Sequence, residues 1–277
     1  MFKDGTIHSN LFTVIAIAII AYAGANITHE ILGHCGTMAL LGSKCSFIST
    51  TEIRFTPELS IDWRFRIGAL AGSAANWLVA LICLRLLRAW RNASPPLHFF
   101  LWLSICVNLF LASTYLLVSP IIRFGDWYSI TIGLTHPFFW RSGMIVAGAL
   151  ACWLSFRLCS NELSKLISLE AEHARSTAWS LVVPAYVAGG TISIVAALLG
   201  PLPLKWALFV GGGMFGVTFW FLLLPLRVRA RTVPTQDSFL IPRSRAWIVT
   251  GALVALTFVF VLGPGLSLKF AMGGAEP

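Results

Sequence analysis

The stretch His29-Glu-Ile-Leu-Gly-His34 closes a long apolar run, Leu11 to Ala25, that contains no charged residue. An ionisable group in hydrocarbon costs about 2.5–3.5 kcal/mol even on the mildest insertion scale, so titratable side chains at this position need partners. Histidine nitrogens are standard zinc ligands, and a glutamate beside the first histidine is where metalloproteases keep their general base. The hexapeptide therefore predicts a metal site. The alternative is that these polar groups lie at the membrane interface and face water.

The spacing of the two histidines departs from the usual H-E-x-x-H pattern. In a regular α-helix, side chains at i and i+4 are about 40° apart around the axis, whereas those at i and i+5 are about 140° apart. A one-residue π-bulge would bring His34 back to the face of His29, and such bulges concentrate at functional sites. Gly33 would tolerate the distortion because it has no Cβ. A shared metal site at this spacing would therefore need a one-residue π-bulge here.

The composition is that of a membrane protein. The 277 residues are 57% hydrophobic and 11% charged, whereas soluble domains are about 25% charged. Several apolar runs reach the roughly 20 residues that span a bilayer. We expect an all-α polytopic membrane protein in which about seven transmembrane helices form one membrane domain. A small-residue cleavage site does not follow the first run, so a cleavable signal peptide is not expected.

Short polar segments separate the expected spans. The segment 43–65 contains many β-branched and aromatic residues and predicts a short strand or β-hairpin near the membrane face. Residues 160–176 alternate charged residues with leucine and predict a surface helix. The seven spans cover about 11–41, 67–87, 97–122, 138–158, 178–199, 204–226 and 246–262.

The net charge of +9 reflects arginines in the loops between apolar runs, which is the ordinary signature of membrane topology rather than of nucleic-acid binding. The loops on the N-terminal side hold twelve Lys and Arg residues and those on the opposite side hold eight, which favours a cytoplasmic N-terminus. The first span alone argues the reverse, since more positive charge follows it than precedes it. The six cysteines form no C-x-x-C pair and four lie in or beside spans, so a disulfide framework is not expected.

A third metal ligand has to come from another part of the chain. Catalytic zinc sites usually have three protein ligands and one open position. Most carboxylates in this chain lie in polar loops or near its ends, but Asp126 lies at the end of a span among aromatic and glycine residues. Asp126 is therefore the best candidate. The alternative is an interfacial aspartate that pairs with Arg123.

Two amides lie inside apolar spans, where each needs a hydrogen-bond partner. Asn76 follows a run of small residues, 68–75, which would let helices approach closely. Asn108 lies in the next span. For Asn76, a structural contact between helices and a direct role with substrate both remain open.

Three elements in this order resemble the site-2 protease family of intramembrane zinc metalloproteases. The first is the His29-Glu30 motif, the second is Ala71-Gly-Ser-Ala-Ala-Asn76, and the third is Asn108 followed by Gly125-Asp-Trp127. The segment 43–65 is also similar to the membrane-associated strands of that family. The resemblance covers about residues 11–130. The H-E-x-x-G-H hexapeptide also resembles the zinc motif of the third dipeptidyl peptidase family, a soluble family from which only the local ligand geometry could carry over.

The resemblance implies a metalloprotease core in residues 1–130, with four further spans of the same membrane domain in residues 131–277. The expected activity is that of a zinc metalloendopeptidase, which hydrolyses a peptide bond within or near a transmembrane segment of a membrane-protein substrate. The implied roles are Zn²⁺ ligation by His29, His34 and Asp126, general-base catalysis by Glu30, and substrate positioning or oxyanion stabilisation by Asn76 and Asn108.

The sequence also departs from the family pattern. The histidines are at i+5, Ser73 replaces a proline, and Gly-Asp-Trp replaces the Asp-Gly ligand motif. Two alternatives to an active protease therefore stay open. One is a catalytically inactive, protease-like membrane scaffold, and the other is a transporter with a structural metal site.

Overall fold

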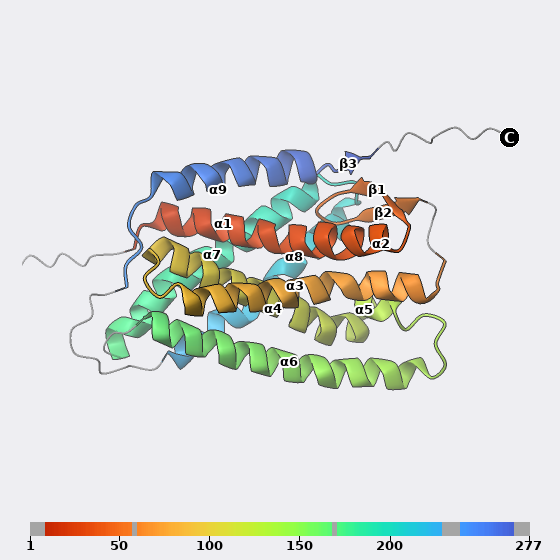
Figure 1. The fold of residues 1–277 in the computed structure, drawn as a ribbon, viewed down its shortest axis with the longest axis horizontal. Helices are drawn as coiled ribbons and strands as arrows, with labels where there is room; N and C mark the ends of the chain where they lie inside the picture. Colours follow the sequence, from red (N-terminus) through yellow and green to blue (C-terminus); the bar gives the residue numbers. More distant parts are fainter. Residues whose placement is uncertain (1–8, 57–59, 168–170, 229–238, 269–277) are drawn as a thin grey trace, which may run out of the picture.

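The computed structural model describes residues 9–56, 60–167, 171–228 and 239–268. Within these ranges, seven helical segments are long and apolar enough to cross a membrane. They lie side by side along one direction, and a small sheet covers one end of the bundle (Figure 1). The expected all-α polytopic membrane fold is therefore confirmed, and each expected span coincides with one of these segments.

Several span boundaries are set by identifiable capping residues. The side chain of Asn10 accepts a hydrogen bond from the Thr13 N–H at 3.1 Å, and Asp62 accepts one from the Arg64 N–H at 2.8 Å. Both satisfy backbone donors that a helix leaves unpaired at its start. The helices are α1 (Leu11–Ile27), α2 (Gly36–Leu40), α3 (Trp63–Ala89), α4 (Pro95–Ile122), α5 (Asp126–Ser129), α6 (Pro137–Leu166), α7 (Ala171–Leu198), α8 (Leu204–Thr218) and α9 (Arg245–Thr257), with π-helical η1 (Thr28–Cys35) and η4 (Phe258–Leu262) and 3₁₀-helical η2 (Phe219–Leu223) and η3 (Pro225–Arg227).

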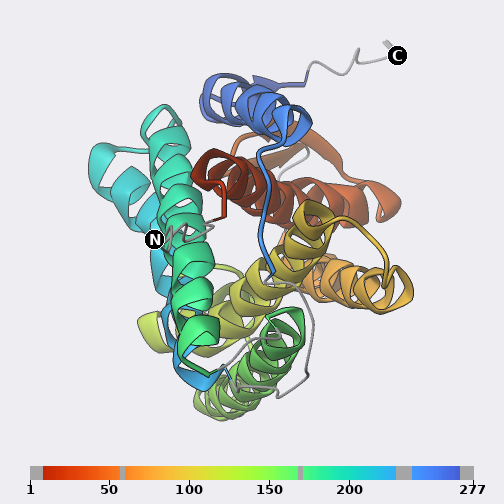
Figure 2. The ribbon, with the colours of Figure 1, turned by 90° about the vertical axis from the view of Figure 1, so that its left-hand side faces the viewer.

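Helix α4 is the centre of the bundle and its most buried span. It packs against α1, α3, α6 and α8, and the end-on view shows it passing between them (Figure 2). Its buried aromatic residues include Phe99, Trp102 and Phe110, and both Trp102 and Phe110 meet Phe221 of η2 edge to face. The last four spans therefore belong to the same packed unit as the first three.

The expected hairpin in segment 43–65 is present as β1 (Lys44–Ile48) and β2 (Ile53–Thr56), which pair antiparallel. Residues 57–59 of that segment lie outside the described ranges. A third strand, β3 (Leu266–Ser267), pairs with the other edge of β1 and was not expected. Strand β3 has two residues and its partner lies more than 200 positions away, so no local sequence pattern predicts this strand.

Two expectations from the sequence are wrong. A disulfide joins Cys35, at the end of η1, to Cys45 of β1, with Cα atoms 5.8 Å apart, because the chain reverses between them. The other four cysteines are free and buried. Residues 160–176 do not form a separate surface helix: α6 continues to Leu166 and α7 begins at Ala171, while residues 168–170 lie outside the described ranges.

Candidate metal centre

Where the spacing called for a one-residue π-bulge, the structure has a π-helix of eight residues, η1 (Thr28–Cys35). The wider turn brings the side chains of His29 and His34 onto one face, with ring centroids 4.8 Å apart and ring planes nearly perpendicular. An α-helix could not bring these i+5 side chains together. The π-helix is therefore the local feature that makes a two-histidine site out of this spacing.

Helix α3 packs directly against this face through two glycines. A Cβ atom placed on Gly33 would stand 2.5 Å from the Cα of Gly72, so neither position has room for a side chain. A Cβ on Gly72 would also stand 2.7 Å from the Nε2 atoms of both His29 and His34. The absence of a side chain at Gly33 thus permits the close approach of α3, whether or not Gly33 also eases the π-helical backbone. The absence of a side chain at Gly72 leaves space for both imidazoles.

Asp126, the first residue of α5, reaches the same point directly after the turn that follows α4. Gly125 has φ 84°, a conformation that L-residues rarely adopt, and any Cβ there would meet the hydroxyl of Tyr115. That hydroxyl accepts a hydrogen bond from the Asp126 N–H at 3.0 Å. The hydroxyl of Ser119 fixes the other side of the turn, because it donates to the Phe124 carbonyl at 2.6 Å and accepts from the Tyr128 N–H at 3.0 Å.

The three side chains converge on one point. The Asp126 Oδ2 atom lies 3.1 Å from His29 Nε2 and 3.2 Å from His34 Nε2. One ligand atom from each residue lies within 4.8 Å of those from the other two. Arg123, the alternative partner of Asp126, makes no ion pair with any described residue. The three expected ligands are therefore brought together, although Asp126 lies 97 positions after His29 in the chain.

The tautomer of His29 follows from a chain of hydrogen bonds between buried amides that ends at its Nδ1 atom. Asn108 Nδ2 donates to the Ser104 carbonyl at 2.8 Å. Asn76 Nδ2 donates to the Ala25 carbonyl at 2.9 Å and to Asn108 Oδ1 at 2.7 Å, which uses both of its hydrogens. The Asn76 Oδ1 atom, 2.8 Å from His29 Nδ1, must then accept. His29 therefore carries a hydrogen on Nδ1.

The same argument applies to His34. Its Nδ1 atom lies 2.7 Å from the carbonyl oxygen of Gly68, which can only accept, so this nitrogen also carries a hydrogen. In the neutral tautomers, both Nε2 lone pairs then face the Asp126 carboxylate. The two nitrogen lone pairs and the carboxylate oxygen repel one another unless a positive charge lies between them. That charge is either an added proton on an imidazole or a metal cation. Buried metal-binding histidines have this same Nδ1–H to carbonyl or amide arrangement.

The charge on Asp126 is consistent with this arrangement. Burial alone would raise the pKa of its carboxyl group, but the adjacent His34 and His29 outweigh burial and hold the pKa well below its usual range. The carboxylate is thus ionised and available as a ligand. Two imidazole nitrogens and one carboxylate oxygen form a donor set that Zn²⁺ prefers, with a position left open for a fourth ligand.

Glu30 and His29 lie in the wall of a cavity of about 350 Å³ that no residue of α3 lines. No described residue forms a hydrogen bond or ion pair with the Glu30 carboxylate. Most of the remaining wall is apolar and comes from α4, α8 and η4, and a polar end is formed by Asn26, Thr50 and Thr51. A carboxylate with no fixed partner beside the candidate ligands can accept a proton.

Neither Asn76 nor Asn108 lines this cavity. Their side chains are 0% and 2% exposed, and their amide groups are occupied by the contacts described above. The expectation that they orient substrate or stabilise an oxyanion finds no contact to support it. Their geometry favours the structural alternative, in which Asn76 holds the ring of His29 and Asn108 holds Asn76.

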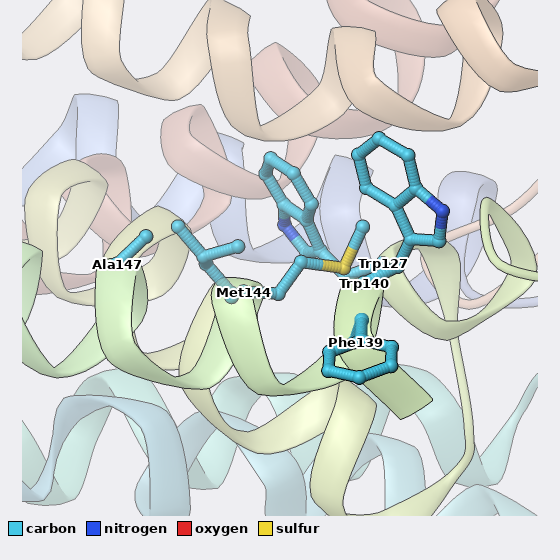
Figure 3. Close-up of a pocket in the computed structure, with 7 residues that line it drawn as sticks. Trp127, Phe139, Trp140, Met144 and Ala147 are labelled. Carbon is cyan, nitrogen blue, oxygen red and sulfur yellow. The ribbon is translucent and has the colours of Figure 1, made fainter. Parts of the chain in front are cut away.

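A second hollow lies beyond Asp126 on the outside of α4, α5 and α6. Figure 3 shows the rings of Trp127, Phe139 and Trp140 around it with the thioether of Met144, and its volume is about 640 Å³. Trp127 is anchored there because its indole N–H donates to Ser73 Oγ at 3.0 Å. None of the candidate ligands lines this apolar groove, so the centre opens toward the cavity beside Glu30 instead.

Comparison with known proteins adds nothing to the motif resemblance: no protein-family model, no curated protein and no solved structure matches this chain. Two contributions to the site were missed in the sequence. Tyr115 supports the Asp126 backbone, and its polar group inside a span was the available signal. The glycines of α8 line the cavity, but small residues in a membrane helix usually signal only close packing.

Proposed function

We propose that this protein is an intramembrane zinc metalloprotease that hydrolyses a peptide bond within or near a transmembrane segment of its substrate. The observation that carries the proposal is the convergence of His29, His34 and Asp126 on one point, with Glu30 beside it in the wall of a cavity. The resemblance of the motifs to the site-2 protease family points to the same activity.

The choice of zinc rests on the donor atoms and on the hydrogen-bond partners that orient the two imidazoles. Nitrogen, nitrogen and oxygen donors suit Zn²⁺, while Mg²⁺ and Ca²⁺ prefer oxygen alone. Asn76 and the Gly68 carbonyl fix the imidazole tautomers, so that each Nε2 offers a lone pair to the ion. Zinc bound by such a set supplies Lewis acidity, which acidifies water and polarises a carbonyl group.

Side chains of the protein carry out the proton transfer and bind the substrate. Glu30 is the general base that takes a proton from the attacking water and then passes it to the leaving amine. The cavity beside it is lined mostly by apolar side chains, which suits the apolar side chains of a transmembrane substrate. At its polar end, Thr50 is 6% exposed and its Oγ1 has no hydrogen-bond partner among the described residues. This hydroxyl can bind the backbone of an extended peptide.

The substrate segment must be unwound before its carbonyl can reach the centre, since a regular helix shields its backbone. We therefore expect substrates with helix-breaking residues near the cleaved bond. An extended peptide in the cavity would place apolar side chains against α4 and α8, and its backbone against the polar end.

The test measures zinc and cleavage separately on the purified full-length protein. The variants are His34→Ala, Glu30→Gln and, as a matched control, His98→Ala, whose imidazole contacts the Trp90 carbonyl away from the centre. Zinc is quantified after equilibration in a zinc buffer, and cleavage is followed with a fluorescence-quenched transmembrane peptide that carries a central Gly-Pro break.

Wild type and His98→Ala should hold one zinc per chain and cleave the peptide. His34→Ala should lose both properties, and Glu30→Gln should keep the zinc but lose at least about 100-fold in rate, the lower range for a general base. Zinc without cleavage in the wild type would favour the inactive scaffold or a structural site. A wild type without zinc would remove the proposal altogether.

A further inference from the structure

A polar pocket lies at the end of the bundle opposite the metal centre, and it plays no part in the proposed proteolysis. Its volume is about 260 Å³, and it lies where the C-terminal part of α6 meets the end of η3, at the left in Figure 1. The lining residues are Arg157, Ser160, Asn161, Leu226, Arg227 and Val228.

The donors in this pocket are not matched by acceptors. Ser160 is 4% exposed, yet its Oγ has no hydrogen-bond partner among the described residues. Neither Arg157 nor Arg227 pairs with a carboxylate in the described ranges. Glu162 is the nearest acidic residue in the sequence, and it is already bound by Arg88 at 2.8 Å and Lys165 at 2.9 Å. Two guanidinium groups and a buried hydroxyl thus share one pocket in which no described carboxylate pairs with them.

Both arginines are held in place by aromatic rings. The guanidinium carbon of Arg157 lies 4.9 Å from the ring centroid of Trp153, and that of Arg227 lies 5.7 Å from the ring of Phe156. Stacking on an aromatic ring leaves the planar N–H groups of arginine free at the edge, where they match the oxygens of a phosphate in pairs. The pocket therefore suits an anion with several oxygens.

The surroundings indicate that the anion belongs to a lipid. Arg157 and Arg227 lie within or at the end of two membrane spans, Pro137–Leu166 and Leu204–Arg227. Large apolar side chains beside the pocket are exposed, with Leu154 at 52% and Leu226 at 54%. These side chains would lie against acyl chains while the headgroup occupied the pocket, as in basic pockets between helices that bind anionic lipids.

The orientation of the chain leads to the same ligand. The loops at this end hold twelve of the twenty Lys and Arg residues, which favours the cytoplasmic side. The Cys35–Cys45 disulfide lies at the other end, and disulfides persist in oxidising, non-cytoplasmic compartments. The pocket would then face the cytoplasmic leaflet, which is rich in anionic lipids.

We propose that the pocket formed by Arg157, Arg227 and Ser160 binds the phosphate of an anionic phospholipid headgroup. The proposal is independent of the metal centre. It commits to a membrane lipid rather than to a free phosphate ester, and the experiment distinguishes the two.

The experiment titrates the full-length protein in detergent with short-chain phosphatidylglycerol, and native mass spectrometry counts the bound lipid. Phosphatidylcholine and glycerol 3-phosphate are titrated in parallel. The variants are Arg157→Gln/Arg227→Gln and Ser160→Ala. The matched control is Arg85→Gln/Arg91→Gln, which removes the same charge at the same end from exposed positions outside the pocket.

Wild type should bind one phosphatidylglycerol in clear preference to phosphatidylcholine. Each arginine contributes about fivefold to affinity, so the double variant should bind about 25-fold more weakly. Ser160→Ala should lose about fivefold, the value of one hydrogen bond, and the control should match wild type. A second double variant, Arg157→Lys/Arg227→Lys, keeps the charge and should fall between wild type and the glutamine variant.

Three results would overturn the proposal. An equal loss in the control and the double variant would show that only surface charge is sensed. Equal binding of phosphatidylcholine would show that no anionic headgroup is selected. Tight binding of glycerol 3-phosphate that displaces the lipid would identify a soluble phosphate ester as the ligand.

Discussion

Gly72 lies so close to His34 that a Cβ on the glycine would stand 2.7 Å from the Nε2 atom of the imidazole. The Gly72→Ala substitution should therefore push both histidine rings away from Asp126. We expect zinc affinity to fall at least about 10-fold, the lower range for residues that orient metal ligands. A zinc titration against a competing chelator measures this change.

The control for that prediction is Gly24→Ala in α1, where a new Cβ would meet nothing within 4 Å. This variant should hold zinc as tightly as wild type. If Gly72→Ala binds zinc as tightly as Gly24→Ala does, the Nε2 atoms of the two imidazoles are not the zinc ligands.

Asn76 is predicted to act on the metal through His29. Asn76→Leu removes the acceptor for the His29 Nδ1 hydrogen, so zinc affinity should fall about 10–100-fold. It also removes the donor to the buried Asn108 Oδ1 atom, which costs about 1–3 kcal/mol of stability. Zinc titration and thermal unfolding provide the two measurements.

Asn108→Leu separates the two roles considered for these amides. Asn108 contacts Asn76 but not His29, so its loss should weaken zinc binding less than the loss of Asn76. An oxyanion-stabilising Asn76 would behave differently: its removal would slow cleavage and leave zinc affinity unchanged. That outcome would restore the role inferred from the family resemblance.

The parts of the site that the sequence predicted are those that depend on local geometry. The i+5 spacing of His29 and His34 required a π-helical turn, and η1 provides it. Asp126 could be selected because few carboxylates lie next to a span. Seven apolar runs of bilayer length sufficed for the fold class.

The parts that the sequence did not predict depend on contacts between distant segments. Strand β3 forms only through its pairing with β1, and Cys35 pairs with Cys45 only because the chain reverses between them. The direction of the Asn76 amide depends on Ala25, 51 positions away. No periodicity or composition encodes such pairings, because each is decided by packing.

The cavity beside Glu30 should be blocked by a side chain on α8. Gly213 lines this cavity, and a Cβ there would meet nothing within 4 Å, so Gly213→Leu can be accommodated by filling the open space. We expect peptide cleavage to fall at least about tenfold while one zinc per chain is retained. Gly212→Leu is the matched control, since Gly212 is also unobstructed but does not line the cavity. Equal rates for the two variants would place substrate elsewhere.

The disulfide makes the orientation of the chain testable. Membranes are denatured with a thiol-blocking reagent, reduced, and then labelled with a heavy maleimide. Two of the six cysteines should become labelled only after reduction, and none should in Cys35→Ser/Cys45→Ser. This variant should also be less stable by roughly 2–3 kcal/mol, the chain-entropy value for a loop of 10 residues.

Reporter fusions then assign the side of the membrane. The described residues contain seven spans, an odd number, so a fluorescent protein that folds only in the cytoplasm should be bright when fused before α1 and dark when fused after α9. Alkaline phosphatase, which needs an oxidising compartment, should give the reverse result. The candidate metal centre lies at the end of the bundle that carries the sheet and the disulfide. This result would therefore place the bond cleaved in a substrate near the non-cytoplasmic end of its transmembrane segment. A bright C-terminal fusion, with all six cysteines blocked before reduction, would place the centre on the cytoplasmic side instead.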